Sequence, residues 1–244
     1  MKKYINLLAA FMLLFLTVGA ETGKTAPNAN SALRVAILNN DLELMAEAIN
    51  KGADVDFVRS DYTDNPLSLA INSDNLPAVK LLLQKGANPN IYVEGNGVIN
   101  ATPLLKAIGR QNAALVKLLV EAGANVNTPA HRYYQPEQKD LSPLMQAIIA
   151  IYTRDTMEIF DYLLVRGANV NYATYDGYTA LMVAASARHS IYKQEAVYTM
   201  AETLLKNGAN SAARNSKGQT ALDLALDNNF SQLAMLLRHR KSGG

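Results

Sequence analysis

Histidines and clustered carboxylates are the residues of this chain whose types could support catalysis or bind a metal. His131, His189 and His239 lie far apart in the sequence, and no two of them have the spacing of metal ligands. The acidic residues of one short segment lack the spacing of a calcium-binding loop: Asp54, Asp56, Asp61 and Asp64. The chain has no cysteine, which excludes thiol catalysis, disulfides and Cys-ligated metals. We therefore predict a non-enzyme without catalytic residues, cofactors or metals.

Tyrosine is the residue type whose number and placement indicate binding. The chain has 12 Tyr but only 5 Phe and no Trp. Tyrosine offers a rigid amphipathic surface and is enriched at the energetic centres of protein interfaces. Most of these tyrosines lie in loops, where some of them could instead hold the loop against the fold. The predicted partner-binding residues are Tyr62, Tyr92, His131, Arg132, Tyr133, Tyr134, Tyr175 and Tyr178.

Two short phrases recur along the chain and predict the elements that position these loops. Gly-Ala-Asn or Gly-Ala-Asp ends five apolar helical runs, at Gly52, Gly86, Gly123, Gly167 and Gly208. A second phrase, apolar and ending in alanine, opens at positions 31, 65, 102, 142, 179 and 220. Its first Ser, Thr or Asn can cap a helix, and proline often follows, which suits a first turn. The glycine of the Gly-Ala-Asn/Asp phrase suits the position at the end of a helix where the backbone becomes left-handed.

These two phrases, 16 residues apart in the first three units, resemble the ankyrin repeat family over about residues 31–238. The resemblance implies an all-α solenoid of about six helix-turn-helix repeats, with β-turn fingers between repeats, that binds a folded protein. The family's usual TPLH histidine is absent from every repeat. In that neighbourhood lie Ser68, Leu105, Met145 or Gln146, Met182 and Asp223. Because that histidine helps to tie adjacent repeats, we expect lower stability.

Insertions distinguish this chain from a uniform array of 33-residue repeats. Successive Gly-Ala-Asn/Asp glycines are 34, 37, 44 and 41 residues apart. The first three fingers are long by 1, 4 and 7 residues, whereas those ending in Asp176-Gly177 and Lys217-Gly218 turns are not extended. The fourth and fifth helix pairs gain 4 and 8 residues, in segments 149–156 and 186–195. These insertions either extend the rim opposite the fingers or lengthen the helices.

The two ends of the chain predict export. Lys2 and Lys3 precede an apolar stretch that ends in Val18-Gly19-Ala20, as in a secretory signal peptide of bacterial type cleaved after residue 20. Glu21 excludes a lipoprotein cysteine, so we expect a periplasmic or secreted protein. The predicted segments are a signal peptide (1–20), a lead-in (21–30), repeats (31–60, 61–97, 98–137, 138–174, 175–215 and 216–238) and a basic tail (239–244).

The balance of acidic and basic residues limits the classes of molecule that this chain is expected to bind. Without Lys2 and Lys3 the chain has 21 basic and 21 acidic residues, which does not favour nucleic acid or anionic lipid. We expect a monomer that binds a folded protein without catalysis. By resemblance to exported bacterial ankyrin proteins, the expected partner is an envelope or secreted enzyme or toxin, and the expected role is that of an inhibitor or immunity protein. The alternatives are an accessory or stress factor that supports a periplasmic enzyme, and a scaffold that links envelope proteins.

Overall fold

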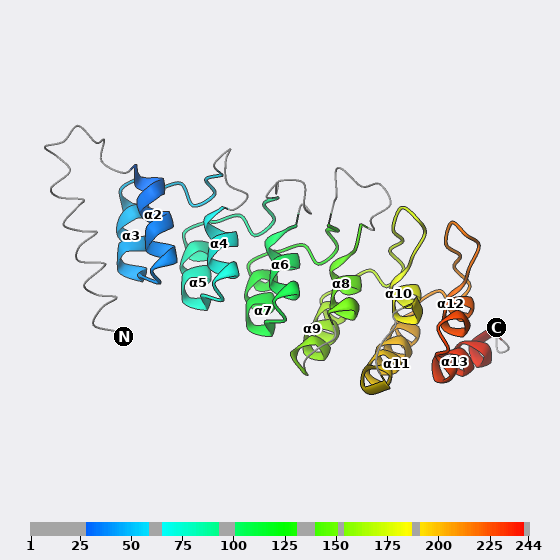
Figure 1. The fold of residues 1–244 in the computed structure, drawn as a ribbon. Coiled ribbons are helices and arrows are strands. Elements are labelled where there is room, and N and C mark those ends of the chain that lie inside the picture. The colour runs from blue at the N-terminus through cyan, green and yellow to red at the C-terminus, as the bar shows by residue number, and fades with distance from the viewer. Residues whose placement is uncertain are drawn as a thin grey trace, which may run out of the picture.

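The fold is a row of helix pairs. The computed structural model describes residues 28–58, 65–92, 101–130, 140–150, 154–186 and 191–241. These residues form twelve helices and no strand, which confirms the predicted all-α solenoid of six repeats (Figure 1). The first helices of the pairs are α2 (Ala29–Leu38), α4 (Pro66–Asn72), α6 (Pro103–Gly109), α8 (Pro143–Ile149), α10 (Ala180–Ser186) and α12 (Ala221–Asp227). The second helices are α3 (Leu42–Asn50), α5 (Leu76–Gln84), α7 (Ala113–Glu121), α9 (Arg154–Val165), α11 (Ile191–Lys206) and α13 (Ser231–Lys241).

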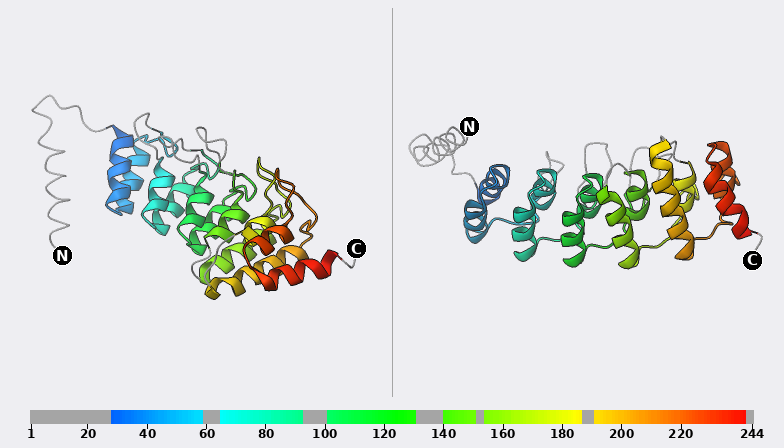
Figure 2. Two further views of the ribbon diagram at one scale, coloured as in Figure 1. Left: turned by 45° about the vertical axis from the view of Figure 1, so that its right-hand side comes forward. Right: turned by 90° about the horizontal axis from the view of Figure 1, so that it is seen from below.

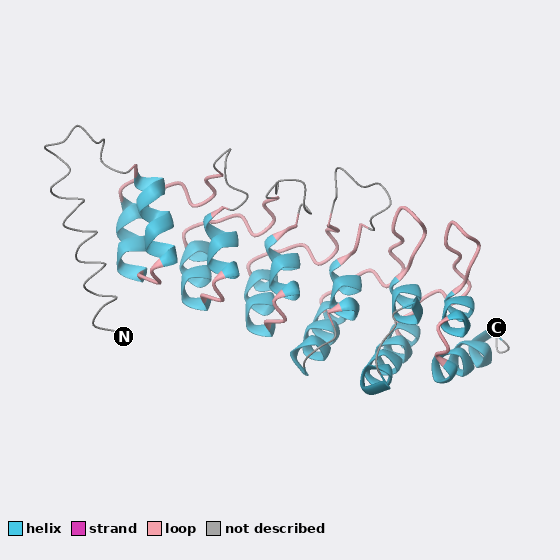
Figure 3. Cartoon of the chain, in the orientation of Figure 1, coloured by secondary structure: helices cyan, strands magenta, loops and turns pink. Residues whose placement is uncertain are grey.

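The helices form two parallel rows, which Figure 2 shows from below. Each first helix packs against the first helix of the next repeat, from α2 to α12, and each second helix packs against the next second helix. We call the first helices the inner row and the second helices the outer row. A continuous apolar core lies between the rows and includes Leu33, Leu67, Leu104, Leu144 and Leu181. The connections between repeats, which we call the fingers, leave the helices at the same end wherever the structure describes them (Figure 3).

Polar side chains start the inner helices as the sequence predicts. In four repeats, the side chain that opens the apolar phrase accepts the backbone N–H of the residue three positions later. These capping residues are Asn65, Thr102, Ser142 and Thr220. The first repeat differs, because α2 begins at Ala29 and the Oδ1 of Asn28 caps it by accepting the Ser31 N–H at 2.9 Å. Ala32 replaces the proline found in the next three repeats, so position 31 is free to be helical. The prediction that Ser31 caps this helix was therefore wrong.

The glycines that follow the outer helices adopt the predicted left-handed conformation. Gly52, Gly86, Gly123, Gly167 and Gly208 have φ values between 84° and 95°. The Gly123 N–H, for example, donates to Val120 O, and the next N–H, of Ala124, donates to Leu119 O. This pattern pairs the last carbonyls of α7 and turns the chain into the finger.

The insertions in the fourth and fifth helix pairs lengthen the outer row. Helices α3, α5 and α7 each have 9 residues, whereas α9 has 12 and α11 has 16. The insertions therefore lengthen these helices. Because α9 and α11 extend away from the fingers, the insertions also extend the rim opposite the fingers (Figure 1).

Adjacent repeats are tied by a ladder of side-chain hydrogen bonds, which the sequence analysis did not foresee. Its rungs are the side chains of Asp56, Asn90, Asn127 and Asn171, each of which accepts a backbone N–H of the next repeat. Asn127 Oδ1 accepts the Asn169 N–H at 2.7 Å, and its Nδ2 donates to Gly167 O at 3.1 Å. These bonds join the first five repeats one to the next, where the TPLH histidine is missing. At that histidine's position, Leu105, Met145 and Met182 are buried apolar residues.

Candidate protein-binding surface

The last two fingers form a paired ridge. The Thr174 N–H donates to Tyr178 O at 2.9 Å, and the Gly177 N–H donates to Thr174 O at 2.8 Å, which closes the predicted turn. The Ser216 N–H of the next finger donates to Asp176 O at 2.9 Å. Because each finger is closed by its own bonds and joined to its neighbour, side chains on this ridge are held in place.

Two predicted contact residues lie on this ridge in different environments. The Tyr175 side chain, next to the turn, is 86% exposed. Tyr178 is half-buried and packs against the apolar core. Tyr175 is thus available to a partner at little cost in structure, whereas Tyr178 also supports the base of its finger.

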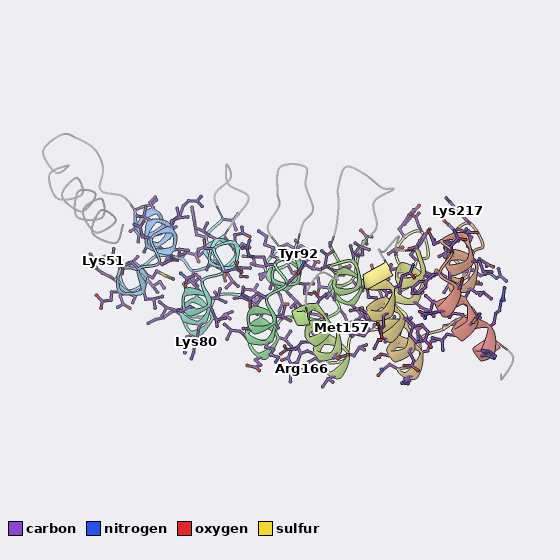
Figure 4. The ribbon with its side chains drawn as sticks, turned by 60° about the horizontal axis from the view of Figure 1, so that its bottom comes forward. Lys51, Lys80, Tyr92, Met157, Arg166 and Lys217 are labelled. Carbon is purple, nitrogen blue, oxygen red and sulfur yellow. The ribbon has the colours of Figure 1, made fainter. Side chains whose placement is uncertain are left out.

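Tyr92 links two fingers. Its hydroxyl donates to Pro129 O at 3.1 Å, while the residue remains 38% exposed (Figure 4). Burial raises the pKa of Tyr92 and of the core-packed Tyr172, and the nearby carboxylate of Asp140 raises the pKa of both further. Tyr92, Asp140 and Tyr172 come from three successive fingers. Tyr92 therefore holds two fingers together and also keeps an exposed face that a partner can contact.

The other predicted contact residues lie outside the described part of the chain. They are Tyr62, His131, Arg132, Tyr133 and Tyr134. Their assignment as partner contacts remains a prediction, as does that of Tyr92, Tyr175 and Tyr178.

Charge is divided unevenly between the two rows of helices. The inner helices carry four Asp, Glu, Lys or Arg residues and the outer helices carry sixteen. Three inner helices, α4, α8 and α10, carry none. The outer row includes Lys80, which Figure 4 labels. Most residues of α4, α8 and α10 are buried, so the low charge of the inner row reflects its place in the core, and this row offers only its few exposed residues to a partner.

The exposed side of the inner row includes one residue from the C-terminal end of each inner helix. We call these residues the inner-end row: Leu38, Asn72, Gly109, Ile149, Ser186 and Asp227. Leu38 and Ile149 are large apolar side chains with exposed fractions of 53% and 40%. These residues were not predicted to form a row. Their spacing marks them in the sequence, since each lies seven positions after the start of the apolar phrase.

The acidic residues and the helices of the described chain show no feature of a metal site or a membrane span. Those residues contain no group of three His, Cys, Asp or Glu side chains placed to hold a metal. Asp54 and Asp56 instead accept backbone N–H groups of Asp56 and Asn88. In the same part of the chain, none of the helices is long and apolar enough to cross a bilayer.

Family comparison decides the identity of the repeat. The model of ankyrin repeats in three copies matches residues 4–93 and 144–243, and the single ankyrin repeat model matches residues 100–131. The chain belongs to the ankyrin repeat family. Ankyrin repeats bind folded proteins, so the fold assigns this chain to protein-interaction modules. The first matched range begins within the segment that the sequence predicts to be a signal peptide.

Curated relatives share the ankyrin repeats but are much longer proteins. Mouse (Mus musculus) palmitoyltransferase ZDHHC13 is 45% identical over 67 residues, which is 28% of this chain and 11% of the relative. Human (Homo sapiens) palmitoyltransferase ZDHHC17 is 34% identical over 194 residues, which is 79% of this chain and 27% of the relative. Because the chain spans so little of these enzymes, the similarity shows a shared binding module.

Two solved structures resemble nearly the whole solenoid. One is a chain from the complex of the predatory endopeptidase Bd0816 of Bdellovibrio bacteriovorus with immunity protein Bd3460. The match has a TM-score of 0.66 and 26% identity and covers 85% of this chain and 97% of that one. The other is the ankyrin repeat protein EF0377, with a TM-score of 0.68, 21% identity, and coverage of 86% of this chain and 97% of that one. The second likeness concerns the fold alone.

Proposed function

We propose that this protein is an exported inhibitor of the immunity type, which binds a peptidase and blocks it. The observation that carries the proposal is the inner surface, where charge-poor inner helices meet a rigid finger ridge bearing the exposed Tyr175. Occluding an active site requires only a rigid surface of the right shape, because no group of the inhibitor has to react. The similar chain in the Bd0816–Bd3460 complex comes from an assembly of this kind, an endopeptidase with an immunity protein.

The proposed compartment is the periplasm or the exterior of a bacterial cell. It rests on the predicted signal peptide of residues 1–20 and on the absence of cysteine, which makes the protein indifferent to an oxidising environment. Fractionation of producing cells, followed by N-terminal sequencing of the protein, tests this directly. A mature N-terminus at Glu21 in the periplasm or medium supports export, and an intact chain in the cytoplasm contradicts it.

The decisive experiment measures peptidase activity in the presence of residues 21–244. The purified protein would be titrated into fluorogenic peptide assays of individual secreted and envelope peptidases from the producing organism. An inhibitor lowers the activity of one enzyme at a one-to-one ratio, whereas an accessory factor raises or preserves it and a scaffold leaves it unchanged. Tyr175→Ala should weaken inhibition by about 30-fold if this tyrosine is worth about 2 kcal/mol at the interface.

A matched variant controls for effects on the fold. Lys80→Ala changes an exposed residue of the outer row and should leave inhibition unchanged. Equal losses in Tyr175→Ala and Lys80→Ala would show that the finger ridge is not the contact surface. If no peptidase is inhibited, the proposed function is wrong.

A further inference from the structure

The two ends of the row of helix pairs have no neighbouring repeat to cover them. Helices α2 and α3 lie at one end of the row, and α12 and α13 lie at the other (Figure 1). Terminal repeats of a solenoid usually carry a polar outer face, because nothing stacks on it. Equivalent positions along the six repeats identify which residues each end presents.

Leu226 is an exposed apolar residue at the C-terminal end. It is 45% exposed, whereas the equivalent residues of the five earlier repeats are 0% exposed: Ile37, Ile71, Ile108, Ile148 and Ala185. Each of those five repeats has a following repeat and the last one has none, so this position faces the following repeat. Leu222, one turn earlier on α12, is half-buried, although its five equivalents are all buried leucines. We call Leu222 and Leu226 the C-terminal face.

Val35 is an exposed apolar residue at the N-terminal end. It is 39% exposed, whereas its apolar equivalents Leu69, Val183 and Leu224 are buried. Leu224 is buried in the last repeat, which has no following neighbour, so this position faces the preceding repeat. Leu38 lies three residues after Val35 on the same surface of α2 and is also exposed. We call Val35 and Leu38 the N-terminal face.

The two ends carry net charges of opposite sign. Residues 28–58 include two basic and five acidic residues, whereas residues 208–241 include five basic and two acidic residues. Glu43 and Glu158 occupy equivalent positions, each nine residues before the glycine of its finger. Glu158 pairs with Lys117 of the preceding repeat. Glu43 therefore faces the side where the first repeat has no neighbour, so an acidic residue lies beside the N-terminal face.

We propose that copies of this protein associate end to end, with the N-terminal face of one copy seated on the C-terminal face of the next. The C-terminal face consists of the positions that the next inner helix covers within the chain, so a second copy can stack there as a further repeat would. Opposite net charges favour this order of ends, and like charges disfavour contact between two identical ends. The contact is heterologous, so it adds copy after copy without closing at a dimer.

The side-chain ladder does not extend across this junction. Ala212 stands where the earlier fingers have their rungs, four residues after the glycine, and alanine has no acceptor to offer. End-to-end association should therefore be weaker than the stacking of repeats within the chain, and it should depend on protein concentration. This differs from the monomer expected from the sequence. It does not rest on the proposed function, because its test needs no peptidase.

Sedimentation of residues 21–244 over a hundredfold range of concentration tests the association. The weight-average mass should rise continuously and pass that of a dimer. Val35→Arg and Leu226→Arg each place a charge on one apolar face, where contact would desolvate it, and each should weaken association at least 10-fold. Val165→Arg is the matched control, because Val165 is an exposed apolar residue of α9 far from both ends, and it should associate as the wild-type protein does.

Mixing the two end variants tests the order of the ends. The intact C-terminal face of Val35→Arg can meet the intact N-terminal face of Leu226→Arg, while the two altered faces repel each other. An equimolar mixture should therefore form one-to-one dimers at concentrations where neither variant associates alone.

Three results would overturn the inference. They are a wild-type protein that stays monomeric over the whole range, a mixture of the two variants that stays monomeric, and a wild-type dimer that only one of the two substitutions disrupts. Circular dichroism would check that both variants keep their helical content. If either variant does not, Val35→Gln and Leu226→Gln replace the pair, with the same expected pattern.

Discussion

The side chain of Ser68 buries a hydroxyl group that has no hydrogen-bond partner. Its Oγ is fully buried and makes no hydrogen bond, and the same is true of the Nδ2 of the neighbouring Asn65. The corresponding positions in the next repeats are the buried Leu105 and Met145. A buried hydroxyl without a partner costs free energy, because its hydrogen bonds to water are lost and not replaced.

We expect Ser68→Ala to raise the free energy of unfolding by about 1 kcal/mol, since it removes this unpaired hydroxyl. The control is Ser142→Ala, whose hydroxyl accepts the Met145 N–H and caps α8. That change should lower the free energy of unfolding by about 1 kcal/mol. Urea unfolding followed by circular dichroism measures both, and a loss of stability in Ser68→Ala would contradict the assignment.

The Asp74–Arg110 ion pair predicts a dependence of stability on pH. The Arg110 guanidinium lowers the pKa of Asp74 below its ordinary value of 3.8. The pair's contribution is therefore complete well above 3.8, from about pH 5.5, and is lost as the pH falls through the lowered pKa. Both side chains are more than a third exposed, so solvent screening limits the contribution to about 0.5 kcal/mol.

Arg110→Met should accordingly be less stable than the wild-type protein at pH 7, and the difference should shrink as the pH falls from 4 toward 2. Arg166→Met is the matched control, because the Arg166 guanidinium lies over the Tyr162 ring rather than against a carboxylate. Thermal unfolding of the three proteins between pH 2 and 7 makes the comparison. A gap for Arg110→Met that is independent of pH would show that the lost interaction is packing.

At the scale of elements, the ladder has one weak rung. Asp56 accepts the Asn88 N–H, but a carboxylate has no N–H to donate, whereas Asn90, Asn127 and Asn171 also donate to a glycine carbonyl. Asp56→Asn would add a donor for Gly86 O and should raise the free energy of unfolding by about 1 kcal/mol. Asn127→Asp, which removes the donor to Gly167 O, should lower it by a similar amount. Denaturant titration of both variants measures the two opposite shifts, and equal signs would contradict the role of the ladder.

The pairing of the last two fingers depends on close backbone approach. A Cβ on Gly177 would lie 3.0 Å from Asn215 Cα and 3.2 Å from Arg214 O, whereas one on Gly218 would meet nothing within 4 Å. Both glycines have positive φ, so alanine at either position costs about 1 kcal/mol of backbone strain. Gly177→Ala should cost about 1 kcal/mol more, since the fingers must also separate. Hydrogen exchange of the Ser216 N–H should accelerate in Gly177→Ala and stay slow in Gly218→Ala.

At the scale of the whole molecule, the division of charge between the rows predicts how binding responds to salt. The inner row carries few charges, and the mature chain predicted from the sequence has equal numbers of acidic and basic residues. Long-range attraction to a partner should therefore be weak. We expect the dissociation constant for the inhibited peptidase to change less than threefold between 0.05 and 0.5 M NaCl. A change of 30-fold or more, measured by surface plasmon resonance, would assign recognition to charged fingers.

How much of this protein could be predicted depends on the range of the interactions involved. Helix starts at Asn65 and Thr102, helix ends at Gly86 and Gly123, and the turn at Gly177 follow from local backbone chemistry and were predicted correctly. Two asparagines follow each of Gly86, Gly123 and Gly167, as the sequence shows. Their role as a ladder could not be predicted from it, because the rungs join residues 32 to 42 positions apart.

The sequence by itself determined the repeat, its phase and the places where residues are inserted, because helix caps, left-handed glycines and apolar spacing act within a few residues. Only the tertiary structure decided that the insertions of the fourth and fifth helix pairs extend α9 and α11, that Tyr92 ties two fingers, and that Gly109 lies open in a charge-poor inner row. These properties exist only once repeats stack, since a residue's exposure and partners depend on what the neighbouring repeat covers.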